Sequence, residues 1–325
     1  MEFLAIVIPG IILALVLSAW AHFADDRPPL AILLYVVFGL GAFAFIGLGG
    51  VTVLLADDLA AELEEDIFGV RTGVFMMLTG AVIGVSLLPP FRQLLSRLMP
   101  INPRSMPDMV GLVVMLALSV SMIWTIDLTF ANGNGQEEFA PAAESSLILQ
   151  AVLLVAIAYF AIGGAINRDL SSVRERLGLH MPTLRQVVIS VALIVPLFMV
   201  SAIGGVLTDI FQPGLTDDID VIMDEVTADL INVQGALLIG ITAGVGEEIL
   251  FRGAIQPRYG LIFTSLIFAV IHVQYGFSFV LVGIFLTSIV LGIQRQKMNT
   301  TCCIITHSVY NFAVVMMSVI FASQM

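Results

Sequence analysis

Charge is the scarcest property of this 325-residue sequence. Only 12% of the residues are charged, 59% are hydrophobic, and the mean hydropathy is +1.04. Soluble domains carry about 25% charged residues, so that class is excluded. Backbone polar groups inside lipid must pair within the chain, and the ten-residue alternation of a membrane β-barrel is absent. The composition therefore predicts an all-α, polytopic transmembrane helix bundle.

Basic residues and cysteines are also few. Lys and Arg together number 13 against 25 Asp and Glu, which gives a net charge of −12. Nucleic acid is not an expected partner, because phosphate binding requires clustered basic side chains. Cys302 and Cys303 are the only cysteines and are adjacent, so they provide neither a disulfide framework nor metal-ligand spacing. We expect both to serve as ordinary apolar packing.

The apolar segments indicate about ten spans, with eight to ten plausible, since crossing the hydrocarbon takes about 20 residues. Glu2 replaces the basic region of a signal peptide, so we expect the first apolar run to be a span rather than a cleaved leader. The predicted spans are 3–23, 30–56, 72–91, 109–131, 146–166, 187–209, 233–254, 260–275, 278–293 and 302–322.

The distribution of basic residues predicts the orientation. Every Lys and Arg except Arg71 lies in or beside a connection that follows an odd-numbered span. Basic residues concentrate in cytoplasmic loops, so these connections are expected in the cytoplasm and both termini outside. The expected location is a prokaryotic plasma membrane.

Three places in the C-terminal third interrupt the apolar pattern with polar side chains. An ionisable group inside a membrane costs roughly 2.5–3.5 kcal/mol on insertion scales, and such groups usually serve function. In "GVGEEILFRGAI", Glu248 and Arg252 are four residues apart and share a helical face, which predicts an ion pair. Glu247 lies about 100° around the helix and has no obvious local partner, which suits a general base.

The other two places carry histidine. His272 follows Phe268 by one turn in "FAVIH", and "HSVYN" places His307 and Asn311 on one helical face. Each could be a structural contact between helices, as buried His and Asn often are. Together with Glu247 they offer what hydrolysis needs: a base for water and hydrogen-bond donors for an oxyanion.

These three motifs, EExxxR, FxxxH and HxxxN in that order, resemble the CPBP family of intramembrane proteases. That family includes the type II CAAX prenyl endopeptidases and their bacterial and archaeal relatives. The resemblance covers roughly residues 233–318. It divides the chain into residues 1–186, transmembrane helices of unassigned role, and residues 187–325, a catalytic membrane core.

The resemblance implies a glutamate-dependent endopeptidase acting on a membrane-associated substrate, prenylated in eukaryotic relatives. Glu247 would activate water with help from His272, while His307 and Asn311 would hold the oxyanion. Glu248 and Arg252 would pair and orient the site. The expected partners of the protein are membrane lipid and a membrane-associated peptide or protein. The active site of the protein would open toward the cytoplasm.

Alternatives to metal-free proteolysis remain open at this point. Zinc could be held by Glu247, His272 and His307 with an open fourth position, although Asn is a poor zinc ligand. HExxH and GxSxG motifs are absent, which excludes those protease classes. The same polar residues could also serve a non-catalytic membrane scaffold or immunity protein, or the proton relay of a transporter.

Overall fold

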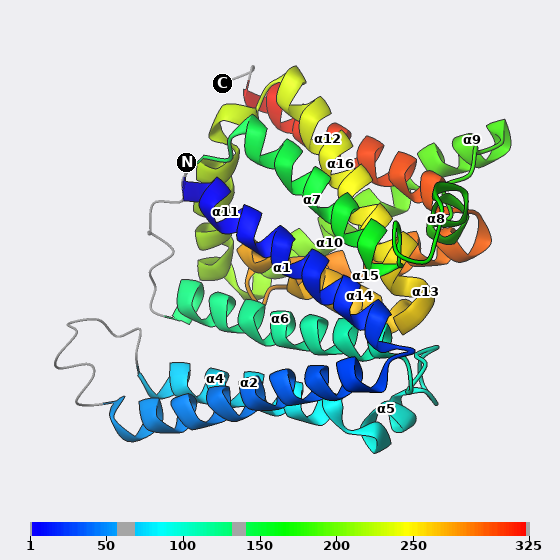
Figure 1. Cartoon of the computed structure of the whole chain (residues 1–325). Coiled ribbons are helices and arrows are strands. Elements are labelled where there is room, and N and C mark those ends of the chain that lie inside the picture. Colours follow the sequence, from blue (N-terminus) through cyan, green and yellow to red (C-terminus); the bar gives the residue numbers. More distant parts are fainter. Residues whose placement is uncertain (1, 57–68, 132–140, 323–325) are drawn as a thin grey trace. The chain divides into compact units, whose positions relative to one another are not determined.

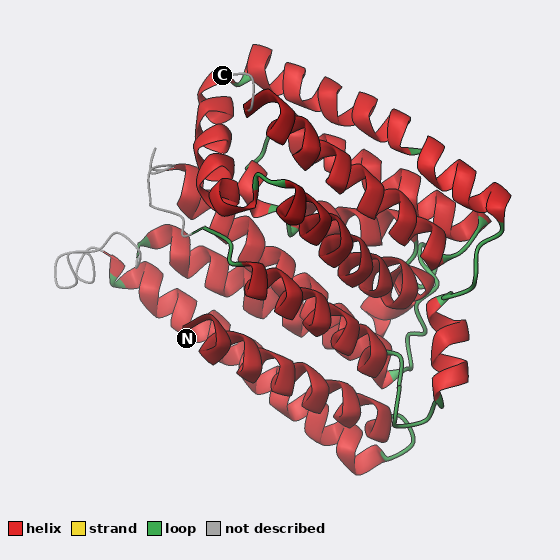
Figure 2. Cartoon of the chain, turned by 90° about the horizontal axis from the view of Figure 1, so that it is seen from above, coloured by secondary structure: helices red, strands yellow, loops and turns green. Residues whose placement is uncertain are grey.

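The computed structural model describes residues 2–56, 69–131 and 141–322. Within these ranges the chain forms helices joined by loops, and no strand is present (Figure 2). Eight helices in the described ranges are long and apolar enough to cross a membrane. The all-α polytopic class is therefore confirmed, and the protein is an integral, multi-pass membrane protein.

The helices fall into two compact units, and the first comprises Leu17–Leu128. It contains the C-terminal part of α1 (Glu2–Ala24), α2 (Pro28–Leu54), α4 (Val70–Leu87), α5 (Pro89–Leu95) and most of α6 (Met106–Ala131). The helices α2 and α4 approach so closely that a Cβ on Gly49 would lie 2.5 Å from the Gly73 carbonyl oxygen. This unit is therefore joined by direct backbone packing between small residues, as membrane helices often are.

The second unit comprises Met1–Val16 and Thr129–Met325 and contains all six candidate site residues. Its helices after residue 129 are α7 (Glu144–Ala161), α8 (Leu170–Leu177), α9 (Leu184–Ala192), α10 (Ile194–Phe211), α11 (Pro213–Thr227), η2 (Ala228–Leu230), α12 (Val233–Glu248), η3 (Ile249–Ile255), α13 (Gln256–Tyr259), α14 (Leu261–Val270), η4 (Val273–Tyr275), α15 (Phe279–Lys297) and α16 (Thr300–Ala322) (Figure 1). The proposed functional boundary at residues 186 and 187 stays a prediction.

The predicted segment 260–275 is shorter as a helix than the sequence suggested. Gly260 turns the chain with φ +80°, and α14 then runs only from Leu261 to Val270. Ten residues extend about 15 Å, which is half of the hydrocarbon thickness. His272 therefore lies in the link that follows a half-span, directly before η4.

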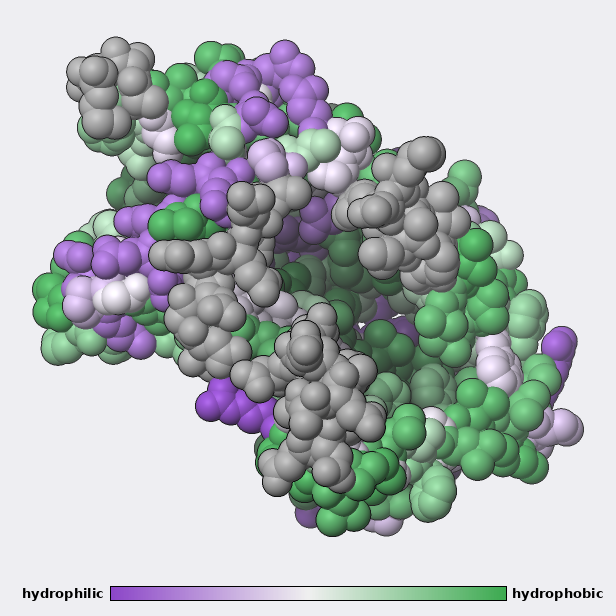
Figure 3. Space-filling model, turned by 90° about the vertical axis from the view of Figure 1, so that its left-hand side faces the viewer, coloured by the Kyte–Doolittle hydropathy of each residue, from purple (hydrophilic) through white to green (hydrophobic). Residues whose placement is uncertain are grey.

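Large apolar side chains are exposed over many helices. Phe43 and Leu54 on α2 are 77% and 83% exposed, and Ile210 on α10 is 62% exposed. In Figure 3, hydrophobic residues gather on the right-hand and lower parts of the face, and hydrophilic residues gather at its upper left. Such exposure would be costly in water but is expected where lipid surrounds a helix.

Glycines bring α12 and α16 into backbone contact. A Cβ on Gly240 would lie 2.7 Å from the Ser308 carbonyl oxygen, and one on Gly244 would lie 2.9 Å from the Ser308 nitrogen. The two helices lie side by side in Figure 1. This small-xxx-small contact sets Glu248, one turn beyond Gly244, against α16.

Gly244→Val is expected to destabilise the protein by about 1–3 kcal/mol, because the added carbons meet backbone that cannot move aside. The free energy of unfolding in mixed micelles measures the effect. Gly205→Ala is the control, because nothing lies within 4 Å of its added Cβ. Equal stability of Gly244→Val and the wild type would contradict the close packing of α12 on α16.

Candidate functional site

The candidate site begins where α12 changes its helical form. The α-helix ends at Glu248, and a π-helical stretch follows from Ile249 to Ile255. A π-helical turn is wider than an α-helical turn and is found frequently at functional sites. Within this stretch Arg252 is fully buried, as is Glu248 at its start.

The predicted ion pair between Glu248 and Arg252 is present. Arg252 Nε lies 3.3 Å from Glu248 Oε2, and both side chains are 0% exposed. Arg252 also donates from Nη2 to Ser288 Oγ on α15 at 3.2 Å, and its guanidinium lies 4.7 Å from the centre of the Phe268 ring. A charge pair without access to water is strongly coupled, so loss of either partner leaves the other buried and uncompensated.

Glu248 has a second partner that the sequence did not predict. His307 Nδ1 lies 2.8 Å from Glu248 Oε1, and His307 is 7% exposed. With Glu248 ionised, Nδ1 is the donor, and the carboxylate fixes the orientation of the ring. Glu248 thus joins α12, the π-helical stretch and α16 through one carboxylate.

His272 is positioned by Phe268 from the preceding turn. His272 Nδ1 lies 2.7 Å from the Phe268 carbonyl oxygen. Because a carbonyl only accepts, Nδ1 carries the proton, so Nε2 of the neutral ring is a free base. The Phe268 ring lies 4.8 Å from the His272 ring and 6.1 Å from the His307 ring, between centroids. The FxxxH motif therefore links both histidines to the Arg252 guanidinium.

Glu247 and Asn311 are not part of this bonded cluster. Glu247 Oε2 is buried and has no hydrogen-bond partner among the described residues. Glu247 directly precedes Glu248 at the end of α12. Asn311 is one turn after His307 on α16 and is partly buried.

The conditional zinc ligands do not form a metal cluster. Over the described ranges, no three His, Cys, Asp or Glu side chains are arranged to hold a metal ion. The set Glu247, His272 and His307 is therefore not assembled as a first coordination shell in this structure.

Two supporting residues were missed by the sequence analysis. Ser288 is fully buried beside Arg252, and Tyr275 stacks on His272 with ring centroids 6.5 Å apart. Neither carries a distinctive sequence signal, because serine is common between membrane helices and a tyrosine after a span is an ordinary interfacial residue.

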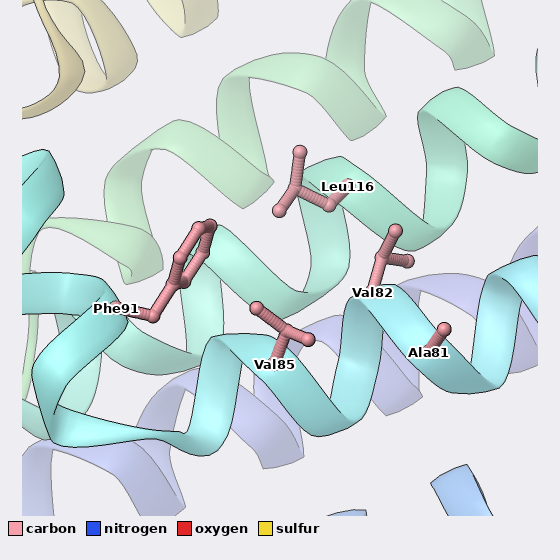
Figure 4. A pocket seen from close by; sticks show the side chains of 5 residues that line it. All are labelled: Ala81, Val82, Val85, Phe91 and Leu116. Atoms are coloured by element: carbon pink, nitrogen blue, oxygen red, sulfur yellow. The ribbon is translucent and has the colours of Figure 1, made fainter.

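A pocket of about 160 Å³ lies in the other unit, Leu17–Leu128 (Figure 4). Apolar side chains line it: Ala81, Val82 and Val85 of α4, Phe91 of α5 and Leu116 of α6. It offers no ionisable group for chemistry, so the candidate site remains the polar cluster of the second unit.

The fold and this cluster define the class of the protein, a polytopic helical membrane protein with ionisable residues buried between its helices. Residues 230–313 match the family model described as type II CAAX prenyl endopeptidase Rce1-like. This match confirms the resemblance inferred from the three motifs. The match covers about a quarter of the chain and includes all six candidate residues. Searches among curated proteins and among solved structures gave no match.

Proposed function

We propose that the protein is an intramembrane endopeptidase that hydrolyses a peptide bond of a membrane-associated substrate by glutamate-activated water. The match to a CAAX endopeptidase family supports peptidase activity in general. The observation that carries the specific proposal is the buried Oε2 of Glu247, which has no hydrogen-bond partner among the described residues and is next in sequence to the Glu248–Arg252–His307 cluster. A carboxylate oxygen in that environment can accept a proton from water.

Glu247 acts as the general base in this proposal, and His272 assists it. The Phe268 carbonyl holds the Nδ1–H of His272, which leaves Nε2 able to receive a proton. Protonation of either group prepares it to return the proton to the leaving amine, as peptide hydrolysis requires.

His307 and Asn311 stabilise the oxyanion in the proposed mechanism. For His307 to donate from Nε2 while Nδ1 donates to Glu248, the ring must be imidazolium. Two carboxylates, Glu247 and Glu248, then balance Arg252 and His307, so the buried cluster is neutral overall. Electroneutrality lowers the cost of holding four charges away from water.

The proposed substrate reaches the site from the cytoplasmic side, in keeping with the basic connections near Arg252 and Arg258. A prokaryotic plasma membrane stays the expected location. A prenylated peptide ending in CAAX is the appropriate first probe, because that is the substrate class in the family's description.

Cleavage of that peptide by the purified protein tests the proposal. Wild type in detergent or nanodiscs is expected to release the C-terminal tripeptide, detected by mass spectrometry. A non-prenylated copy of the peptide reports whether the lipid is needed. Absence of cleavage, together with proton uptake into liposomes, would favour the relay of a transporter instead.

Chelation separates the metal-free mechanism from the zinc alternative. We expect cleavage to be unchanged after incubation with a strong chelator and dialysis, because Glu247 and not a metal activates the water. Loss of activity that zinc restores would overturn the glutamate mechanism and assign Glu247, His272 and His307 to a metal.

A further inference from the structure

The π-helical stretch that carries Arg252 runs directly into a proline. Pro257 is five residues after Arg252 and four after Gly253. In a π-helix the amide of residue 257 would donate to the Arg252 carbonyl, and in an α-helix it would donate to the Gly253 carbonyl. Proline has no N–H, so Pro257 can make neither bond. The Arg252 carbonyl therefore has no π-helical donor and the Gly253 carbonyl has no α-helical donor, which leaves both oxygens open to donors from elsewhere in the chain.

Two arginines from different parts of the chain supply these donors. Arg295, on α15, donates from Nε to the Arg252 carbonyl oxygen at 3.3 Å. Arg176, on α8, donates from Nη1 to the Gly253 carbonyl oxygen at 3.1 Å. Both side chains are partly buried, so water competes less for these bonds than it would at the surface.

Hydrogen bonds from α16 hold the short helix α8 in the position from which Arg176 reaches the Gly253 carbonyl. Thr300, at the start of α16, donates from its nitrogen to the Gly178 carbonyl at 3.0 Å and from Oγ1 to the Leu177 carbonyl at 2.5 Å. Gly178 adopts φ +70° and lies against the Arg295 guanidinium, since an added Cβ would be 2.6 Å from its central carbon. A side chain there would push Arg295 away from the Arg252 carbonyl.

We propose that Arg176 and Arg295 are positioning residues of the active site, acting as a clamp on the Arg252 and Gly253 carbonyls that keeps the Arg252 guanidinium on Glu248. This inference rests on the proposed function for its catalytic consequence. It also gives a role to α8, which precedes both residue 187 and the family-matched segment, so the catalytic core extends back at least to residue 170.

The test compares Arg176→Gln and Arg295→Gln with Arg168→Gln. Arg168 is the matched control, because it donates to a backbone carbonyl, that of Ile162, at 2.7 Å but not to the π-helical stretch. Each clamp variant is expected to lower kcat by about ten- to a hundredfold with KM changed by less than about threefold, because misplacement of a reacting group by about 1 Å has effects of that size. Arg176→Lys and Arg295→Lys should recover part of kcat.

Amide hydrogen exchange over residues 249–259 gives a readout that does not depend on catalysis. Both Gln variants should lose protection in this segment, and Arg168→Gln should keep it. Unchanged protection in both Gln variants would overturn the clamp. Wild-type kcat in both clamp variants, with Glu247→Gln inactive, would also overturn the clamp but would leave the proposed function standing. An inactive wild type overturns the proposed function, and the exchange result still decides whether the clamp exists.

Discussion

Glu247→Gln is expected to lower kcat for peptide cleavage by about 10²- to 10⁴-fold, the contribution typical of a general base. Glutamine preserves the size of the side chain but cannot accept the proton from water. Because Glu247 Oε2 has no hydrogen-bond partner among the described residues, the substitution removes a charge but no hydrogen bond, so it should destabilise the fold less than Glu248→Ala does. Initial rates at saturating substrate, with the unfolding midpoint measured in the same detergent, check both parts.

Glu144→Gln is the matched control for this prediction. Glu144 lies at the start of α7 and accepts a hydrogen bond from Gln234 of α12 at 3.1 Å, so it is an acid in contact with the same helix as Glu247. Its substitution should leave kcat at the wild-type value. If Glu247→Gln cleaved as fast as Glu144→Gln, Glu247 would not be the base.

Glu248→Ala should produce the largest loss of stability, about 3–5 kcal/mol, together with loss of cleavage. The substitution leaves Arg252 buried without its counter-ion and removes the acceptor that orients His307. Breaking one side of a buried pair has effects of this size because the remaining charge is desolvated and uncompensated. Denaturation in mixed micelles measures the free energy of unfolding.

The control for Glu248 is an exposed ion pair. Arg71 Nη1 lies 3.6 Å from Asp127 Oδ2, with the Arg71 side chain 67% exposed. Asp127→Asn should change stability by less than about 1 kcal/mol, as exposed pairs do. The double variant Glu248→Leu, Arg252→Met should regain much of the stability lost in Glu248→Ala while remaining inactive. Full activity in either Glu248 variant would show that the cluster is not part of the catalytic site.

The helical class and the Glu248–Arg252 pair could be predicted because they depend on local spacing. Hydropathy identifies membrane segments, and a separation of four residues puts two side chains on one helical face. The order of the three motifs then gave the resemblance to a protease family, which the match at residues 230–313 confirmed. None of these inferences needs knowledge of how the helices pack.

The contacts between distant segments could not be predicted in the same way. The bond from His307 to Glu248 depends on how closely α12 approaches α16, which Gly240 and Gly244 permit. The π-helical form of residues 249–255 and the half-span at Leu261–Val270 depend on tertiary packing around Pro257 and Gly260. Apolar periodicity does not distinguish an α-helical turn from a π-helical one.

A double-mutant cycle on kcat/KM tests most directly whether Glu247 and His272 belong to one catalytic unit. The four proteins are the wild type, Glu247→Gln, His272→Gln and the double variant, assayed on the same prenylated peptide with mass-spectrometric detection. Residues that act as a unit are strongly non-additive, so the double variant should be little slower than Glu247→Gln alone. Losses that multiply would show that the two side chains act independently and would contradict a shared hydrolytic centre.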